Sequence, residues 1–449
     1  MSGALATLRG EIGVLARRGS ATMAVRFGAI ALALLQTAVL ARILEPSGYG
    51  QYAVAFSIVT ILAAPAQLGF PVLALRETAK ARQAADWPAL NGVMAWSTAT
   101  GGAVGLVLSG LLLAIVFAAG DRLPALGVST QLMVFASLLI PVVIIANVLG
   151  SVLQGFSHPA LGQMQDAVVR PLATVVLLAA AAGLSASGFS PAFAMGLHLA
   201  AAAIGLLFAG AFVLRLRPAA SRTAAPRLAG SGAWLRSIGP LSALGGLQLI
   251  NLHVGVLLLG WIGHASDAGV LRVVMQGGTA INAGTYAVGL VAAPAFARLY
   301  AAGDLAALRR LSGRCALACL ALTLPLVAVI AVWSEDILRL AFGEGFARGA
   351  LALVLVALGR LLYAAYGCTD VLMTMIGAER DSMRNLAWGA GANILLTVAL
   401  APLFGLAGAA AASSLAVGLS SALLWSAARR KLASRAPLPA LAPILGARR

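Results

Sequence analysis

TQLMVFASLLIPVVIIANVLGSVL, residues 130–153, carries no charged side chain and is long enough to cross a bilayer as one helix. A helix needs about 20 apolar residues to span about 30 Å of hydrocarbon. Similar stretches follow one another along most of the chain. They are too long and too continuously apolar for barrel strands of about ten alternating residues, so we expect helices.

The composition assigns the whole chain to the membrane. Of its 449 residues, 61% are hydrophobic and 10% are charged, and the mean hydropathy is +0.96. Because about a quarter of the residues in a soluble protein are charged, we predict an all-α polytopic membrane protein with about twelve spans. The expected spans are 21–43, 52–75, 91–118, 130–153, 166–184, 190–214, 239–262, 269–295, 314–333, 349–369, 385–403 and 406–427.

Basic residues are distributed unevenly over the loops between these spans. With the N-terminus in the cytoplasm, 24 of the 31 Lys and Arg residues, Arg170 among them, fall on the cytoplasmic side and five on the other. This positive-inside bias favours an even number of crossings, with both termini cytoplasmic. The net charge of +17 then reflects topology and attraction to anionic lipid, and nucleic acid is not an expected partner.

Weak internal repetition divides the chain into two halves. Gly50, in the predicted turn EPSGYGQY (45–52), recurs as Gly269 at an offset of 219 residues, in an equivalent topological place. Two six-helix bundles related by a pseudo-two-fold axis along the membrane normal are a recurring plan of alternating-access transporters. The predicted segments are a cytoplasmic interfacial segment at 1–20, an N-terminal six-helix bundle at 21–214, a basic cytoplasmic linker at 215–238, a C-terminal six-helix bundle at 239–428 and a basic cytoplasmic tail at 429–449.

The eighth expected span carries a polar stripe. In LRVVMQGGTAINAGTY, residues 271–286, polar side chains recur at steps of three and four and so share one helix face. A charge at the bilayer centre costs about 2.5 to 3.5 kcal/mol on insertion scales, so such side chains usually face protein or water. The stripe consists of Arg272, Gln276, Thr279, Asn282 and Tyr286.

Three further spans carry polar or small residues along one face. They are Arg26, Ile30, Ala33 and Thr37 in the first span, Gln248, Asn251 and Gly255 in the seventh, and Arg360, Tyr363, Gly367, Asp370 and Thr374 in the tenth. Together the four faces indicate a wet cavity that binds substrate. Its charged members are mostly arginines, whose forked guanidinium group suits a pyrophosphate or another anion.

A structural explanation stays open beside each of these roles. The amide side chains also pack by hydrogen-bonding a neighbouring helix, and Arg26 and Arg272 also reach the membrane interfaces by snorkelling. Asp370 is expected too far along the same helix to pair with Arg360. It either caps or salt-bridges the cytoplasmic end, or couples transport to a proton or sodium ion. The four scattered histidines give no metal spacing, and we expect neither a metal nor a cofactor.

Five stretches act as landmarks along the chain. They are ARILEPSGYGQYAVAFS (41–57), LRETA (75–79), PAFARLYAAGDLAALRRL (294–311), FGEGFARGA (342–350) and NILLTVALAPLFGLAGAAAA (393–412). Together they resemble the polysaccharide transporters, the O-antigen and exopolysaccharide flippases of the multidrug/oligosaccharidyl-lipid/polysaccharide exporter superfamily. Members of this family often have glycine where Glu45 stands and an acidic residue where Ser47 stands, a difference within a predicted loop that does not affect the expected fold.

The resemblance implies a flippase of the bacterial inner membrane, which is not an enzyme. Such a protein moves an undecaprenyl-pyrophosphate-linked oligosaccharide from the cytoplasmic to the periplasmic leaflet by alternating access, for O-antigen, exopolysaccharide or capsule biosynthesis. Polymerase and chain-length proteins of the same pathway are implied partners. Two alternatives from the same superfamily are a lipid II flippase and a cation-coupled multidrug exporter.

The multidrug exporter agrees less well with the sequence. Such an exporter is expected to bind organic cations through acidic residues within the N-terminal spans, where only Asp166 occurs, at the mouth of the fifth. A membrane-embedded glycan polymerase or ligase is the least consistent alternative. The chain has no D-x-D motif, no P-loop and no long outer loop to carry catalysis.

Overall fold

The computed structural model is helical throughout, and among the residues it describes there is no strand. The described residues are 2–120, 128–184, 189–228, 230–262 and 264–434, with side chains described from residue 27 onward except at 184, 240, 243, 244, 433 and 434. The helices are α1 (Ser2–Gln83), α2 (Trp87–Ala119), α3 (Thr130–Gly155), α4 (Pro159–Met164), α5 (Arg170–Leu184), α6 (Pro191–Leu216), α7 (Ser231–Trp261), α8 (Ala265–Ile281), α9 (Ala283–Ala301), α10 (Leu305–Phe342), α11 (Ala350–Ala365), α12 (Thr369–Met375) and α13 (Glu379–Ser434). Three short turns accompany them, η3 (Gln165–Val169), η4 (Ala219–Ser221) and η5 (Glu344–Gly349).

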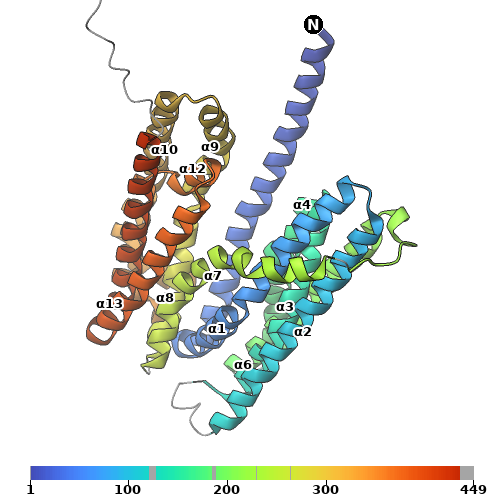
Figure 1. Ribbon diagram of the computed structural model, residues 1–449. Coiled ribbons are helices and arrows are strands. Elements are labelled where there is room, and N and C mark those ends of the chain that lie inside the picture. The colour runs from blue at the N-terminus through green and yellow to red at the C-terminus, as the bar shows by residue number, and fades with distance from the viewer. Residues whose placement is uncertain (1, 121–127, 185–188, 229, 263, 435–449) are drawn as a thin grey trace, which may run out of the picture.

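The helices account for the expected number of crossings. Nine helices of the described part are long and apolar enough to cross a membrane. Three of them contain a non-helical residue, Glu45 in α1, Trp333 in α10 and Gly405 in α13, and within α1 and α13 the chain turns back there (Figure 1). With the shorter apolar helix at Gly245–Trp261, these two divided helices give the twelve crossings expected from the sequence, and the all-α membrane fold is confirmed.

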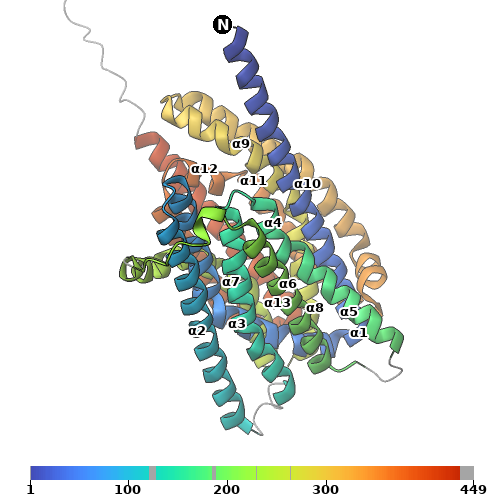
Figure 2. The same ribbon diagram turned by 90° about the vertical axis from the view of Figure 1, so that its right-hand side faces the viewer.

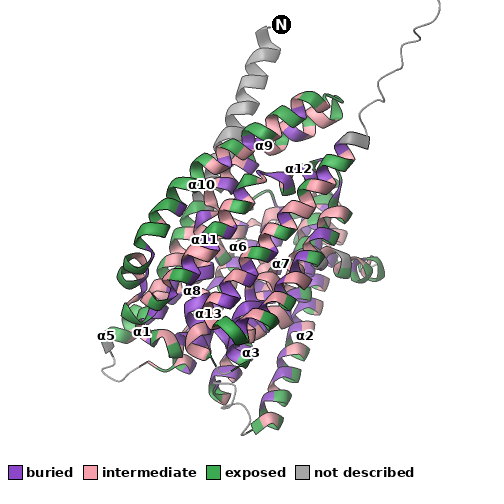
Figure 3. Ribbon diagram, turned by 90° about the vertical axis from the view of Figure 1, so that its left-hand side faces the viewer, coloured by how far each residue is buried: buried purple, intermediate pink, exposed green. Residues whose placement is uncertain are grey.

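The outer surface of the molecule is apolar, as a lipid environment requires. Leu106 on α2, Leu207 on α6 and Leu395 on α13 are 65%, 71% and 72% exposed. Figure 3 shows exposed positions along much of α10, whereas buried residues gather where the helices meet. Side chains of this kind would form a large exposed apolar patch in water but are stable against acyl chains.

The start of the chain is more continuously helical than predicted. α1 runs from Ser2 into the first crossing without a break, and the interfacial position of residues 1–20 stays a prediction. The predicted turn at 45–52 is also mostly helical. Glu45 alone leaves the helix, and Pro46 begins the next crossing, since the fixed φ of proline and its missing N–H suit the first position of a helix.

The predicted linker and tail are more helical than expected. α7 begins at Ser231, inside the predicted linker 215–238, and α13 continues to Ser434, into the predicted tail. Ala, Arg, Lys and Leu are good helix formers, and residues 429–434 contain no glycine or proline that would end α13 earlier. The predicted tail beyond 434 lies outside the described residues.

The linker is anchored to the turn between α1 and α2. Arg227 forms an ion pair with Asp86, which also caps the start of α2. The amide nitrogen of Asn91 donates to the carbonyl oxygens of Ser221 at 2.6 Å and Ala224 at 2.7 Å. These contacts hold the linker against the N-terminal helices.

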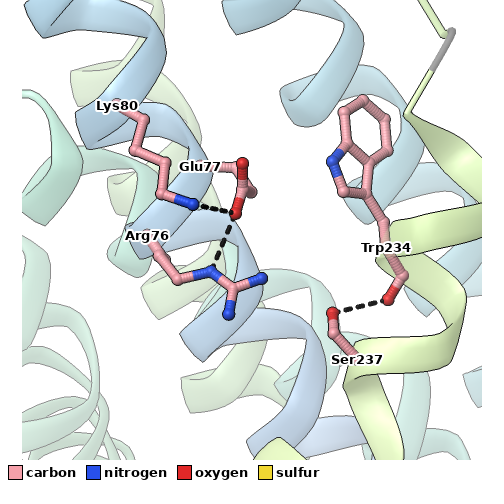
Figure 4. A network of polar contacts seen from close by, with 5 residues as sticks. All are labelled: Arg76, Glu77, Lys80, Trp234 and Ser237. Atoms are coloured by element: carbon pink, nitrogen blue, oxygen red, sulfur yellow. Dashed lines mark hydrogen bonds and ion pairs between the residues drawn. The ribbon is translucent and has the colours of Figure 1, made fainter.

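The first part of α7 runs across the other helices instead of along them, as Figures 1 and 2 show. Its Trp234 packs with Leu73 of α1. Figure 4 shows this tryptophan beside the end of α1, where Glu77 accepts hydrogen bonds from Arg76 Nε at 2.8 Å and Lys80 Nζ at 3.0 Å. The linker therefore leads into a helical arm that lies beside the charged end of α1.

The two halves of the chain meet at two glycines that the internal repeat makes equivalent. A Cβ atom added to Gly50 would overlap the carbonyl oxygen of Ala265, and one added to Gly269 would overlap that of Pro46. The same offset of 219 residues that relates Gly50 to Gly269 relates Pro46 to Ala265. The contact is therefore reciprocal, as in an isologous interface, and small residues let the two helix backbones touch.

Further contacts close this end of the molecule, opposite the end at which α1 begins and α13 stops. The guanidinium of Arg42 donates to the carbonyl oxygens of Leu340 and, at 3.1 Å, Ala341, near the C-terminus of α10. A cation at a helix C-terminus is stabilised by the unpaired carbonyls there. The rings of Tyr49 and Phe346 meet edge to face at 6.3 Å, which seals the same region.

We expect Gly50→Ala to lower the unfolding temperature of the protein in detergent. The added methyl would force α1 away from Ala265, and such overpacking costs about 1 to 3 kcal/mol. Gly48→Ala is the matched control, because its Cβ would lie 3.5 Å from its nearest neighbours in Leu44 and Pro191. Equal unfolding temperatures for the two variants would show that the reciprocal contact does not hold the helices together.

We expect Glu45→Gly to raise the unfolding temperature relative to Glu45→Ala. Glu45 has a φ of 56° and a ψ of 172°, a conformation that glycine adopts readily and residues with a Cβ rarely do. The strain amounts to about 1 to 3 kcal/mol, and alanine keeps it while removing the carboxylate. A Glu45→Ala variant as stable as Glu45→Gly would contradict this strained turn.

Candidate functional site

A cavity of about 580 Å³ lies between the two halves of the chain. Its walls come from α1, α3, α4, η3, α5, α6 and α8, and Tyr49 connects it to the closed end. Much of the lining is polar although the helices around the cavity are apolar. The polar lining residues include Gln36, Thr37, Gln67, Asn147, Ser151, Gln154, Gln163, Gln165, Asp166, Arg170, His198, Arg272, Gln276 and Thr279.

Two arginines from opposite halves of the chain line this cavity. Arg170, at the start of α5, pairs with Asp166 in η3 at 2.5 Å. Arg272, on α8, lies over the ring of Phe56 with its Cζ atom 5.6 Å from the ring centroid. The His198 ring on α6 lies within electrostatic reach of both guanidinium groups. The cavity therefore offers cationic, forked hydrogen-bond donors on both sides.

An aromatic ladder on α1 forms another part of the cavity wall. Tyr49, Tyr52 and Phe56 recur at steps of three and four residues and stack with centroid distances of 5.9 and 6.2 Å. The Tyr52 hydroxyl forms a 2.5 Å hydrogen bond with Nδ1 of His198, and both residues are buried. The ladder is thus rigid, and it gives the cavity a flat apolar surface beside its polar groups.

The charge of the cavity is positive. Among the described lining residues, Asp166 is the one carboxylate, and it is engaged with Arg170. The remaining guanidinium, that of Arg272, is not neutralised by a carboxylate of this lining. Such a site favours an anionic ligand and disfavours an organic cation.

Three of the nine predicted substrate-binding residues line this cavity. They are Arg272, Gln276 and Thr279, the first three residues of the polar stripe in chain order. Thr37, from the predicted face of the first span, lines it as well. Arg26 belongs to α1, but its side chain lies outside the described residues.

The eighth span is not a single helix over 269–295, as the sequence predicted. α8 ends at Ile281 and α9 begins at Ala283, and glycines on both sides of the junction weaken the helix there. The break divides the polar stripe. Asn282 and Tyr286 therefore line a second pocket of about 300 Å³, together with Asp370.

The tenth span also turns where a continuous helix was predicted. Gly367 has a φ of 64°, which ends α11 and starts the separate helix α12. Asp370 therefore does not continue along the face of Arg360. It lies within reach of the preceding helix, where the Tyr363 hydroxyl donates to its Oδ2 atom at 3.0 Å.

Three predicted residues are not among the described residues that line either cavity. Arg360 packs against α8, where its Nε atom would lie 3.1 Å from a Cβ atom on Gly278. Asn251 accepts hydrogen bonds from Nδ2 of Asn393, at 3.0 Å to its carbonyl oxygen and 3.2 Å to its Oδ1 atom. Gln248 is exposed. Asn251 therefore takes the packing role that stayed open beside cavity lining.

Sequence reasoning missed Arg170 as a site residue, because it counted this arginine on the cytoplasmic side although residue 170 falls just inside the predicted span 166–184. The helical segment starts at Pro159, ahead of the predicted span 166–184, so Arg170 lies inside the helix and lines the cavity. The available signal was the spacing of Asp166 and Arg170, because an acid and a base four residues apart form an ion pair on one helix face. A pair of this kind next to an apolar run marks an interior face.

Apolar crossings around an open polar cavity define a multi-pass membrane protein with a transporter fold. The family model described as "Polysaccharide biosynthesis protein" matches residues 15–300. The chain therefore belongs to the polysaccharide biosynthesis protein family. No curated protein matches the chain.

Solved structures of the MOP superfamily share the fold. The lipid II flippase MurJ in an inward closed conformation is similar with a TM-score of 0.73 and 12% identity, over 92% of this chain and 88% of that one. An inward-facing multidrug resistance MATE transporter is similar with a TM-score of 0.71 and 15% identity, over 90% and 95%. An outward-facing MATE transporter gives a TM-score of 0.58 with 14% identity, over 93% and 96%.

Proposed function

We propose that this protein is a flippase for an undecaprenyl-pyrophosphate-linked oligosaccharide, which it moves from the cytoplasmic to the periplasmic leaflet of the bacterial inner membrane. The observation that carries the proposal is the shared cavity lined by Arg170 and Arg272. Pyrophosphate oxygens accept forked hydrogen bonds from guanidinium groups, which stay charged at any working pH. The family supports a cargo from polysaccharide biosynthesis.

The cavity suits the polar head of such a lipid. Its volume of about 580 Å³ falls within the range of about 300 to 1,000 Å³ that is common for small-molecule sites. The aromatic ladder on α1 offers a flat surface against which a sugar ring packs. The prenyl tail, which gains nothing from a polar cavity, stays in the bilayer.

Alternating access follows from the way the cargo would bridge the halves. The guanidinium of Arg272 has no carboxylate partner in the cavity lining, and an anion between it and Arg170 would accept hydrogen bonds from both halves. The bound anion then favours the arrangement in which the two sides approach, and a ligand shifts a conformational equilibrium only through such a difference in affinity. The higher similarity to inward-facing than to outward-facing relatives supports a cytoplasm-open starting state, with the Gly50 and Gly269 contact as its closed periplasmic gate.

The alternatives fit less well or share this chemistry. A lipid II flippase carries another lipid-linked pyrophosphate, so the arginine cavity also supports this second candidate. A cation-coupled multidrug exporter needs an anionic cavity, and here Asp166 is already paired with Arg170. The enzyme alternative gains no support, because the matching solved folds are transporters and a flippase.

We propose Asp370 as the carboxylate that couples transport to a proton or sodium ion. It lines the second pocket together with Tyr363, and its Oδ2 atom accepts a hydrogen bond of 3.0 Å from the Tyr363 hydroxyl. In the same pocket the Oδ1 atom of Asn282 and the Oγ1 atom of Thr285 are buried and have no hydrogen-bond partner among the described residues. Oxygen atoms of this kind are the ligands that hard cations prefer.

We expect cells that carry Arg272→Ala or Arg170→Ala to accumulate the lipid-linked repeat unit in the cytoplasmic leaflet. Each substitution removes charge-assisted hydrogen bonds to the cargo, which contribute about 1.5 to 3 kcal/mol of binding free energy. We therefore expect export to fall about tenfold or more. Mass spectrometry of the prenyl-pyrophosphate glycans, with an impermeant sugar-modifying probe, reports the leaflet and names the cargo. Arg272→Lys should restore export only in part, because an ammonium group lacks the guanidinium fork.

Arg236→Ala is the control for these variants, because Arg236 is exposed on α7, outside the cavity. Normal export by both cavity variants would reject the flippase proposal. New sensitivity to cationic drugs without glycan accumulation would move the protein to the exporter branch.

We expect Asp370→Asn to abolish the dependence of export on the ion gradient, since the amide neither titrates nor carries charge. Export is measured in cells before and after an ionophore collapses the proton or sodium gradient. Asp304→Asn is the matched control, because this exposed residue caps α10 and asparagine caps a helix equally well. A gradient dependence that persists in Asp370→Asn would refute the coupling role.

A further inference from the structure

A third pocket, of about 430 Å³, lies among α10, α11, α12 and α13. It shares no described lining residue with the central cavity or with the pocket of Asp370. In Figure 1 these helix ends lie at the same end of the molecule as the start of α1. In the expected topology this end faces the cytoplasm.

Two arginines give this pocket a positive charge. Arg429 on α13 lies over the ring of Trp425, with its Cζ atom 4.5 Å from the ring centroid. A guanidinium over an aromatic face keeps the N–H groups at its edge available to an anion. Arg309 on α10 donates to the carbonyl oxygen of Leu432 at 3.3 Å and so links α10 to α13 across the pocket.

The pocket lacks a compensating negative charge. None of its described lining residues is acidic, and Asp381, one of two acids in the first turn of α13, pairs with Arg384 at 3.4 Å and Lys431 at 3.2 Å instead. Ser312 and Thr369 add hydroxyl oxygens to the lining. Two guanidinium groups with hydroxyl neighbours form a site for an anionic oxygen group such as a phosphate.

The same pocket borders the lipid. The rings of Tyr366 and Trp425 lie 6.0 Å apart, and Trp425 is 41% exposed. Aromatic residues with one apolar and one wet side gather at the membrane interface. Further along α10, Leu317 is 69% exposed and offers a surface for an acyl chain. A ligand of this pocket would therefore combine a phosphate with an apolar tail.

We propose that this pocket binds the phosphate headgroup of an anionic phospholipid from the cytoplasmic leaflet. A phospholipid fits better than the transported lipid, because the pocket is separate from the cavity assigned to the cargo. Basic pockets between helices on the cytoplasmic side are typical sites for anionic headgroups. The bound lipid would bridge α10 and α13 and so hold the last helix in place.

The test compares two double variants of the full chain in lipid nanodiscs that contain phosphatidylglycerol. R309A/R429A removes both pocket arginines, and we expect it to weaken retention of phosphatidylglycerol in native mass spectrometry at least tenfold. R310A/R430A is the matched control, because it removes the same charge from exposed neighbouring positions outside the pocket. Phosphatidylglycerol should also raise the unfolding temperature of the wild type and of the control, but not that of R309A/R429A.

Three outcomes would overturn the proposal. Equal losses in the two double variants would show general attraction of a basic surface. Equal retention of phosphatidylethanolamine would show that the anionic charge is not recognised. Tighter retention of undecaprenyl phosphate than of phosphatidylglycerol would assign the pocket to the carrier lipid. The single variants R309A and R429A, each expected to lose part of the retention, provide the same comparison if the double variant does not fold.

Discussion

The reciprocal contact of Gly50 and Gly269 determines how the two halves of the chain meet. Neither residue has a side chain, so the backbones of two helices touch, and the repeat makes the same contact twice about a local two-fold axis. A close-packed contact of this kind is either made or lost, because packed interiors do not deform continuously. In the proposed transport cycle, making and losing this contact would separate two discrete arrangements, which alternating access requires.

The closed end also determines where the cavity lies. Arg42 on the carbonyl groups of α10, and Tyr49 against Phe346, hold the halves together at one end. Figure 1 shows the helices of the two halves apart toward the opposite end. The cavity lies between them and receives one arginine from each half, Arg170 and Arg272. The position of the proposed anion site thus depends on the contact between the halves and not on any single helix.

The crossings could be predicted from the sequence because the thickness of the bilayer imposes their length. The turns at Glu45 and Gly405 fall between predicted spans, and the family was recognised from landmarks in the same regions. The site was harder to predict, because a polar helix face looks the same in sequence whether it packs, as Asn251 does, or lines a cavity. The break at Asn282 was also invisible, since glycine-rich membrane helices often stay continuous.

That break changes the meaning of the polar stripe. On one straight helix, the face that carries Arg272 would continue past Asn282 toward the surroundings of Asp370 as one polar surface. The break at Asn282 instead separates a cationic cavity from an acidic pocket, with α8 ending where the second begins. If the proposed roles hold, ion and cargo do not touch, so coupling between them must pass through the position of α8. The stripe is then the connection between two sites of opposite charge.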